Sequence, residues 1–200
     1  MIRGLLRRLH KPIYEYRQKR LVELIAPHLH SGNRVLDVGC GFGHLGRALV
    51  TRIPGLTVEG IERVRRGGEL IPITEYDGRG MPWNDSTFDA VILADVLHHD
   101  LDPDALLREA ARVSKRLVIV KDHLREGFLA HQRISLLDWA ANAGYNVPCT
   151  YRYNNRAEWR RTIGNAGTSL IEERTSIDIY PAVFNQIFGR GLHYFAIFAR

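Results

Sequence analysis

A glycine-rich stretch follows a short apolar run in the first quarter of the chain. Its letters are VLDVGCGFG, residues 35–43, and the part before the first glycine has the pattern of a buried strand. Glycine residues can adopt a positive φ and let a ligand approach the backbone closely. The helix expected next would offer free N–H groups at its first turn, which favour an acidic ligand group. The pattern therefore predicts a small-ligand site at the end of a strand.

Two kinds of ligand fit the glycine residues alone. Gly41, Gly43 and Gly46 match the GxGxxG fingerprint of dinucleotide-binding folds. Asp37, however, stands in the strand two residues before the first glycine. A carboxylate there suits a ligand with an ammonium group and would repel a pyrophosphate. This favours a ligand such as S-adenosylmethionine (SAM), whose methionine end carries an ammonium group, and leaves NAD(P)-dependent oxidation and reduction as a rival.

Acidic residues also stand at the ends of later predicted strands. Glu62 ends the second strand, and Asp77 with Gly78 follows the third, with Met81 close behind. The fourth strand leads into the letters ADVLHH, residues 94–99. With these motifs in this order, the chain from about residue 34 to residue 121 resembles the class I SAM-dependent methyltransferases. It is most similar to the branch of quinone-biosynthesis and small-molecule methyltransferases.

The resemblance implies SAM as the cofactor and methyl transfer to a small-molecule acceptor as the reaction. It places Asp37 near the methionine moiety, Glu62 at the ribose hydroxyls and Asp77 at the adenine. The alternatives, in which neither residue binds a ligand, are that Glu62 is a solvated residue at the end of a strand and that Asp77 only starts a turn with Gly78. The expected cofactor-binding residues are Asp37, Gly39, Cys40, Gly41, Gly43, Glu62, Asp77, Gly78, Met81 and Asp95.

Candidates for proton transfer follow the fourth and fifth predicted strands. His98 and His99 come after the fourth strand, and Asp122 and His123 come directly after the fifth. Imidazole titrates near neutral pH and can accept a proton. Methyl transfer from a sulfonium is a direct displacement that depends mainly on alignment, and it needs a base only when the acceptor must lose a proton. These four are candidate catalytic residues; a structural role in capping or turning is the alternative for each pair.

Short apolar runs alternate with helical patterns along the chain. Such alternation predicts an α/β fold: a Rossmann-like, mostly parallel seven-stranded sheet with an antiparallel C-terminal edge pair and helices on both faces. Seven residues with two adjacent glycines separate the second and third strands, too few for a crossover helix, so an irregular loop is expected there. The expected strands are 34–38, 57–62, 70–76, 88–94, 117–121, 170–177 and 194–199, and the expected helices are 12–29 (with Pro12 at its first position), 45–52, 103–113, 129–143 and 156–166.

The length of 200 residues suits one domain. We expect a single methyltransferase domain, with residues 1–30 as a helical cap and residues 31–200 as the SAM-binding core. No apolar run is long enough to span a membrane, and the N-terminal segment has no secretory apolar region, so a cytoplasmic protein is expected. Cys40 and Cys149 are too few for a disulfide framework or a zinc site, and the sequence predicts no metal.

Charge and aromatic content bear on the acceptor. The net charge is +6, but the basic residues are scattered rather than gathered in a stripe, so nucleic acid is not the expected partner. An RNA methyltransferase and a non-catalytic SAM-binding protein are the alternatives. An aromatic-rich part of the chain, residues 136–159, is expected to wall the acceptor pocket, with Trp139 and Trp159 more typical of core positions. The acceptor itself and the oligomeric state are not determined by these residues.

Overall fold

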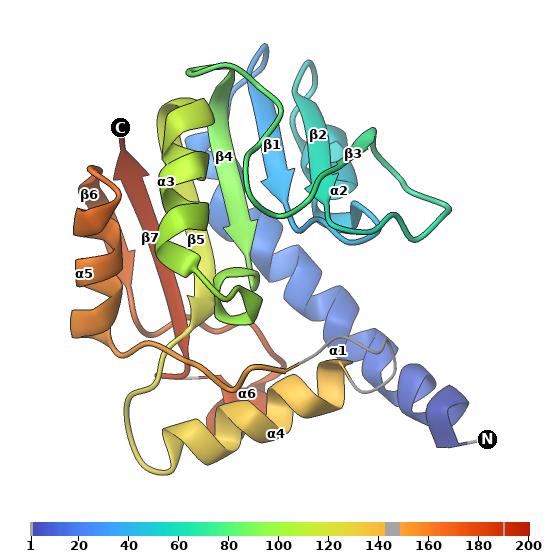
Figure 1. Ribbon diagram of the computed structural model, residues 1–200. Coiled ribbons are helices and arrows are strands. Elements are labelled where there is room, and N and C mark those ends of the chain that lie inside the picture. The colour runs from blue at the N-terminus through green and yellow to red at the C-terminus, as the bar shows by residue number, and fades with distance from the viewer. Residues whose placement is uncertain (1, 143–148, 190) are drawn as a thin grey trace.

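A seven-stranded sheet forms the centre of the molecule, seen in the computed structural model, which describes residues 2–142, 149–189 and 191–200. The strand order is β3-β2-β1-β4-β5-β7-β6 (Figure 1). Strands β1 to β5 pair in parallel, and β7 is antiparallel to both β5 and β6. The predicted mostly parallel sheet with an antiparallel C-terminal edge is therefore confirmed. The strands are β1 Arg34–Val38, β2 Thr57–Glu62, β3 Ile73–Glu75, β4 Phe88–Ala94, β5 Ser114–His123, β6 Ser169–Arg174 and β7 His193–Ala199.

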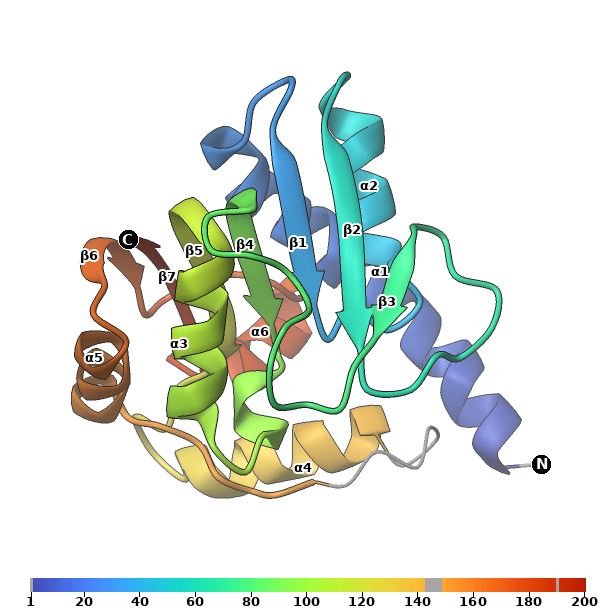
Figure 2. The ribbon, with the colours of Figure 1, turned by 45° about the horizontal axis from the view of Figure 1, so that its top comes forward.

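Helices cover both faces of the sheet. α1 and α2 lie on one face, and α3 and α5 lie on the other (Figures 1 and 2). α4 lies across the edge where β1, β2 and β4 end, with α6 beside it (Figure 1). The helices are α1 Ile2–Ile25, α2 His44–Arg52, α3 Pro103–Val113, α4 Ala130–Asn142, α5 Arg156–Asn165 and α6 Ala182–Phe188, with short 3₁₀ turns η1 Ala26–His28 and η2 Leu97–His99.

Several predicted boundaries differ from the observed ones. The first helix was expected to begin at Pro12, but α1 begins at Ile2 and contains Pro12, which is exposed. One missing amide on the exposed side of a long helix is tolerated when the rest of the helix packs well. The third strand is shorter than expected, and the fifth includes Asp122 and His123, which were expected to follow it. The loop expected after β2 is confirmed. Ala143, the expected last residue of the helix over 129–143, lies outside the described residues.

Alternating residues of each strand divide the core into two layers, because successive side chains of a strand point to opposite faces. In β1, Val35 packs in the cluster that contains Leu21 of α1, whereas Leu36 packs in the cluster that contains Leu107 of α3. Trp159 of α5 is 2% exposed, so its predicted core position is confirmed. Trp139 of α4 is 54% exposed, and its predicted core position is wrong.

The carboxyl ends of β1, β2, β4 and β5 meet along one edge of the sheet, the place where ligands of open parallel sheets bind. α4 lies next to this edge, and the N-terminal part of α1 extends past it (Figure 2). No helix in the described part of the chain is both long and apolar enough to cross a membrane.

Arg112 of α3 fixes the loop that leads from β3 to β4. Its guanidinium donates hydrogen bonds to the main-chain oxygens of Met81 at 3.0 Å and Trp83 at 2.8 Å. It also pairs with Glu109 at 2.8 Å and Asp85 at 3.0 Å. Glu109 in turn accepts the Met81 N–H at 2.9 Å. One side chain with several fixed donors therefore holds the loop that carries Met81, one of the residues expected at the cofactor.

Replacing Arg112 tests this role in stability. Arg112→Lys keeps the charge but loses the planar fork, so we expect the free energy of unfolding to fall by about 1–3 kcal/mol. Urea denaturation followed by circular dichroism measures it. Arg108→Lys, at an exposed position of the same helix, is the control and should change little. Equal stability of the two variants would contradict the role given to Arg112.

Candidate active site

The glycine loop after β1 has a backbone conformation that residues with a side chain rarely adopt. Gly39, Gly41 and Gly43 have φ values of +64°, +60° and +78°. A Cβ on Gly39 would lie 2.5 Å from the Val96 side chain, so Gly39 permits close packing of the loop against the segment after β4. A Cβ on Gly41 would meet no atom within 4 Å. Gly41 thus has a left-handed backbone conformation and borders open space. Both features are expected of a loop that receives a ligand.

Asp37 and Glu62 flank this loop. Asp37 is 2% exposed, and its Oδ2 atom is buried without a hydrogen-bond partner among the described residues. Burial, together with the neighbouring Glu62, raises the pKa of Asp37 to about 7. Glu62 accepts the Gly41 N–H at 2.5 Å and so ties the end of β2 to the loop. The structure brings the two predicted carboxylates together at the carboxyl ends of β1 and β2.

Other residues predicted to bind the cofactor have different surroundings. The Cys40 sulfur packs against Gly60, where a Cβ would lie 2.3 Å away, and burial raises the pKa of the thiol. Asp77 is exposed and accepts the Arg79 N–H at 2.8 Å in a turn. Gly78 adjoins the Arg63 guanidinium, and Met81 is buried.

Asp95 directly follows β4 and has a left-handed conformation, with φ of +57°, which is uncommon for a residue with a side chain. The amino group of Lys121 on β5 donates to its Oδ1 at 2.5 Å, and Arg17 of α1 forms an ion pair with it. Burial and the nearby Arg17 lower the pKa of Lys121 well below its usual value. Asp95 therefore joins α1 to two central strands at the edge where the glycine loop lies.

The four candidate proton-transfer residues gather at the ends of β4 and β5, but in a different pairing from the expected one. Asp122 pairs with His98 rather than with His123: its Oδ1 lies 2.6 Å from His98 Nδ1. Burial lowers the pKa of His98, but Asp122 and Asp138 outweigh it and raise that pKa to about 9. His123 is buried among cationic neighbours, and burial lowers its pKa well below the usual value. The pKa values of His98 and His123 are thus shifted in opposite directions.

A fifth group completes this cluster. Asp138 of α4 is 2% exposed, and its Oδ2 accepts the Tyr153 hydroxyl hydrogen at 2.7 Å. Its Oδ1 lies 3.6 Å from His98 Nε2 and 3.8 Å from His99 Nε2. Burial, together with the neighbouring Asp138 carboxylate, raises the pKa of Cys149. His98, His99 and Asp138 thus face one another.

Sequence reasoning missed Arg17, Lys121 and Asp138. Lys121 could have been recognised from the sequence, since it is one of four lysines in the chain and is the last residue of a predicted strand. Arg17 and Asp138 gave none, because their partners lie 78 and 40 residues away in the sequence and only the fold brings them together.

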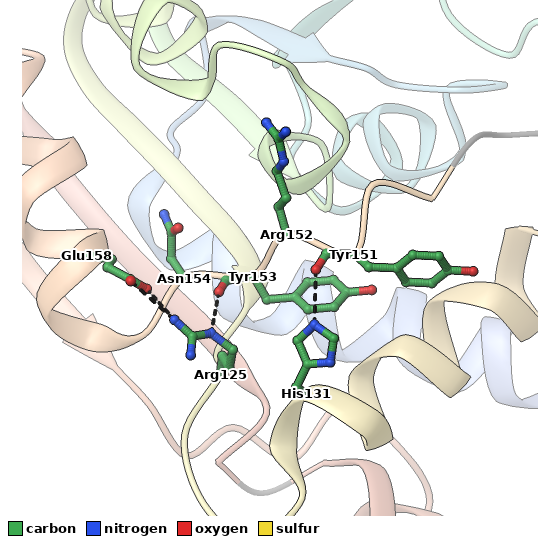
Figure 3. A pocket seen from close by; sticks show the side chains of 7 residues that line it. All are labelled: Arg125, His131, Tyr151, Arg152, Tyr153, Asn154 and Glu158. Atoms are coloured by element: carbon green, nitrogen blue, oxygen red, sulfur yellow. Dashed lines mark hydrogen bonds and ion pairs between the residues drawn. The ribbon is translucent and has the colours of Figure 1, made fainter.

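Two hollows open beside α4. One, of about 440 Å³, is lined by Arg125, His131, Tyr151, Arg152, Tyr153, Asn154 and Glu158 (Figure 3). Figure 3 shows Arg125 paired with Glu158 and bonded to the Tyr153 carbonyl, and His131 bonded to the Tyr151 carbonyl. The other hollow, of about 530 Å³, has mostly apolar walls that include Leu136 and Trp139. Both involve the aromatic-rich part of the chain expected to wall an acceptor pocket.

Known proteins share both the sequence pattern and the fold. A family model described as a methyltransferase domain matches residues 9–173. The ubiquinone/menaquinone biosynthesis C-methyltransferase UbiE of Chromobacterium violaceum is 32% identical over 100 residues, which cover 44% of this chain and 41% of that protein. The demethylmenaquinone methyltransferase of Thermotoga maritima is 32% identical over 109 residues, covering 50% and 45%. The matched segment thus spans less than half the length of either relative.

A solved structure supports the fold. The magnesium protoporphyrin IX methyltransferase of Synechocystis PCC 6803, crystallised with S-adenosylhomocysteine, superposes with a TM-score of 0.64 at 19% identity. The match covers 96% of this chain and 87% of that one. With a family model over most of the chain, a glycine loop at the switch point of the sheet and acidic strand ends beside it, the chain belongs to the class I SAM-dependent methyltransferase family.

Proposed function

We propose that this protein transfers a methyl group from SAM to a small-molecule acceptor. The observation that carries the proposal is the buried Asp37 carboxylate, whose Oδ2 atom has no hydrogen-bond partner in the described part of the chain, next to open space at Gly41. A buried carboxylate without a partner is costly, and a cationic ligand group would compensate it. The ammonium of a methionine moiety is such a group.

The surrounding residues fit the rest of the cofactor. Glu62 lies at the carboxyl end of β2, where a ribose would be held, with one oxygen engaged by Gly41 N–H. Asp77 is exposed in the turn before Met81, where its carboxylate can accept from an adenine amino group. Gly39 and Gly41 keep the loop free of side chains. We therefore assign Asp37, Glu62 and Asp77 to the methionine, ribose and adenine parts.

The chemistry needs alignment more than proton transfer. SAM supplies an electrophilic methyl group on a sulfonium, and the acceptor displaces the thioether directly. The protein's part is to hold donor and acceptor in line and to exclude water, which can account for about 7–11 kcal/mol of barrier lowering in favourable cases. With its pKa raised to about 9, His98 is protonated at neutral pH, so we assign it and Asp122 to positioning rather than to base catalysis.

The hollows beside α4 support a small molecule as the methyl acceptor. The two hollows beside α4 are of the size that small ligands occupy, about 300–1,000 Å³. One carries Arg152 and His131 beside the Arg125–Glu158 ion pair, and the other is mainly apolar. An acceptor that combines an apolar body with a polar or anionic group fits both, and the relatives named for quinone biosynthesis support the same class.

Ligand-induced stabilisation tests the cofactor. We expect SAM and S-adenosylhomocysteine to raise the unfolding temperature, since a ligand at 100 times its Kd adds about 2.7 kcal/mol of stability. Differential scanning fluorimetry, with NAD and NADP as controls, measures the shift. Stabilisation by NAD with none by SAM would overturn the proposal.

Replacing Asp37 tests its carboxylate separately. The pKa of Asp37 in the folded protein is raised to about 7 from an ordinary value of 3.8, so its ionisation opposes folding. Wild-type stability should therefore fall as pH rises from about 4 to about 7, by about 4 kcal/mol at most. Asp37→Asn removes this loss, so the ligand-free variant should become more stable than the wild-type protein as pH rises. The variant should also bind SAM at least about tenfold more weakly than the wild type, because the carboxylate is gone.

Chemical denaturation at pH 5 and pH 8 and calorimetric titration with SAM measure the two effects. Asp104→Asn, at the start of α3 and away from the glycine loop, is the matched control and should change neither. A stability difference between Asp37→Asn and wild type that is the same at both pH values would argue against a buried, protonatable carboxylate at this position.

Transfer of label identifies the acceptor class. SAM with an isotopically labelled methyl group, incubated with the protein and a cell extract, should label a species in the small-molecule fraction, detected by mass spectrometry. The RNA fraction of the same extract is the comparison. Label in RNA alone would replace the proposed acceptor with a nucleic acid, and boiled protein controls for spontaneous methylation.

A further inference from the structure

A cluster of metal-binding side chains lies at the carboxyl edge, contributed by two separate elements. His98 and His99 come from η2, directly after β4, and Asp138 comes from α4. One ligand atom from each lies within 4.8 Å of the other two. Around a tetrahedral zinc ion with bonds of about 2.0–2.1 Å, ligand atoms stand about 3.3 Å apart. The observed distances of 3.6 Å and 3.8 Å from the imidazole nitrogens to Asp138 are close to that, and the two imidazole nitrogens lie within 4.8 Å of each other, so side-chain rotation that brings the imidazoles together would complete the set.

His98 is oriented as a metal ligand is. The residue is 6% exposed, and its Nε2 atom, which faces Asp138, has no hydrogen-bond partner among the described residues. Its Nδ1 atom is held by Asp122 at 2.6 Å. Metal-binding histidines commonly make this contact with a carboxylate on the nitrogen away from the metal, which fixes the ring and increases its basicity. Asp122 accepts the His98 and His123 main-chain N–H groups too, so its own position is well fixed.

The local charge also favours a cation. Asp122 and Asp138 are 0% and 2% exposed, and both adjoin the same imidazole. Tyr153 fixes the other oxygen of Asp138, leaving Oδ1 directed at the two histidines. A buried pair of carboxylates needs positive charge nearby. Without a metal ion the protonated His98 imidazole supplies it, and a divalent ion that displaces the proton on Nε2 would take over that role.

We propose that His98, His99 and Asp138 form a binding site for a divalent transition-metal ion of the zinc type. Two imidazoles and a carboxylate are a ligand set for such ions, and three protein ligands leave a position for water or an acceptor oxygen. The cation would join α4 to the end of β4. The site differs from the cofactor loop, and its occupancy does not depend on the methyl-transfer proposal. Sequence reasoning, which counted cysteines, predicted no metal.

Metal titration of the whole chain tests the site. Protein freed of metal with a chelator should bind one zinc ion per chain in a calorimetric titration. Cobalt(II) should give the visible absorption of a four- or five-coordinate ion, which zinc displaces. His99→Ala and Asp138→Asn should each weaken zinc binding at least about tenfold. Asp138→Asn keeps an oxygen for the Tyr153 hydroxyl, so it preserves the packing, and thermal unfolding of the metal-free variants verifies the fold.

His30→Ala is the matched control, because His30 is exposed in the loop before β1 and should leave zinc affinity unchanged. Wild-type protein that binds neither zinc nor cobalt would overturn the proposal without any variant. Zinc binding that persists unchanged in both folded His99→Ala and Asp138→Asn would also overturn it, since the ion would then lie elsewhere. SAM binding, measured on the same samples by thermal shift, reports separately on the cofactor loop.

Discussion

The site depends on one constraint: ionisable side chains that are buried at the carboxyl edge of the sheet need partners of opposite charge. Parallel strands end together there, so polar side chains from distant parts of the chain are forced into one poorly solvated region. Asp95 is compensated by Lys121 and Arg17, and Asp122 by His98. Asp37 differs, since one of its oxygens is buried without a partner in the described residues. Asp37 is thus the carboxylate at this edge that remains available to a cationic ligand group.

The same compensation explains the opposite pKa shifts of two histidines in contact. His98 and His123 have ring centroids 4.7 Å apart. Two carboxylates adjoin His98, whereas His123 has Lys121, His98 and His193 nearby and no carboxylate partner among the residues that the structure describes. Position relative to charges of opposite sign, rather than burial alone, therefore decides which imidazole carries a proton. Adjacent residues in the sequence, such as Asp122 and His123, need not form the functional pair.

Three central strands, β1, β2 and β4, were the most predictable part of this protein. β1, β2 and β4 have the bounds expected from their apolar runs, because a strand buried on both faces has a continuous apolar pattern. The glycine loop and its carboxylates were predictable because they are contiguous with those strands. The partners of Asp95 and His98 were not, since Arg17 and Asp138 are placed by helix packing. Trp139 shows the same limit: its exposure depends on how α4 crosses the sheet edge.

The first helix has partners near the end of the chain as well as close to it in the sequence. Leu21 and Ile25 share a core cluster with Phe195 and Ile197 of β7, and the Arg20 guanidinium donates to the Asp178 carbonyl at 3.0 Å. α1 also packs against α2, but the part of its apolar face that β7 covers stays open until β7 has been synthesised. The contacts between α1 and β7 therefore form late, because contacts of high sequence separation fold slowly.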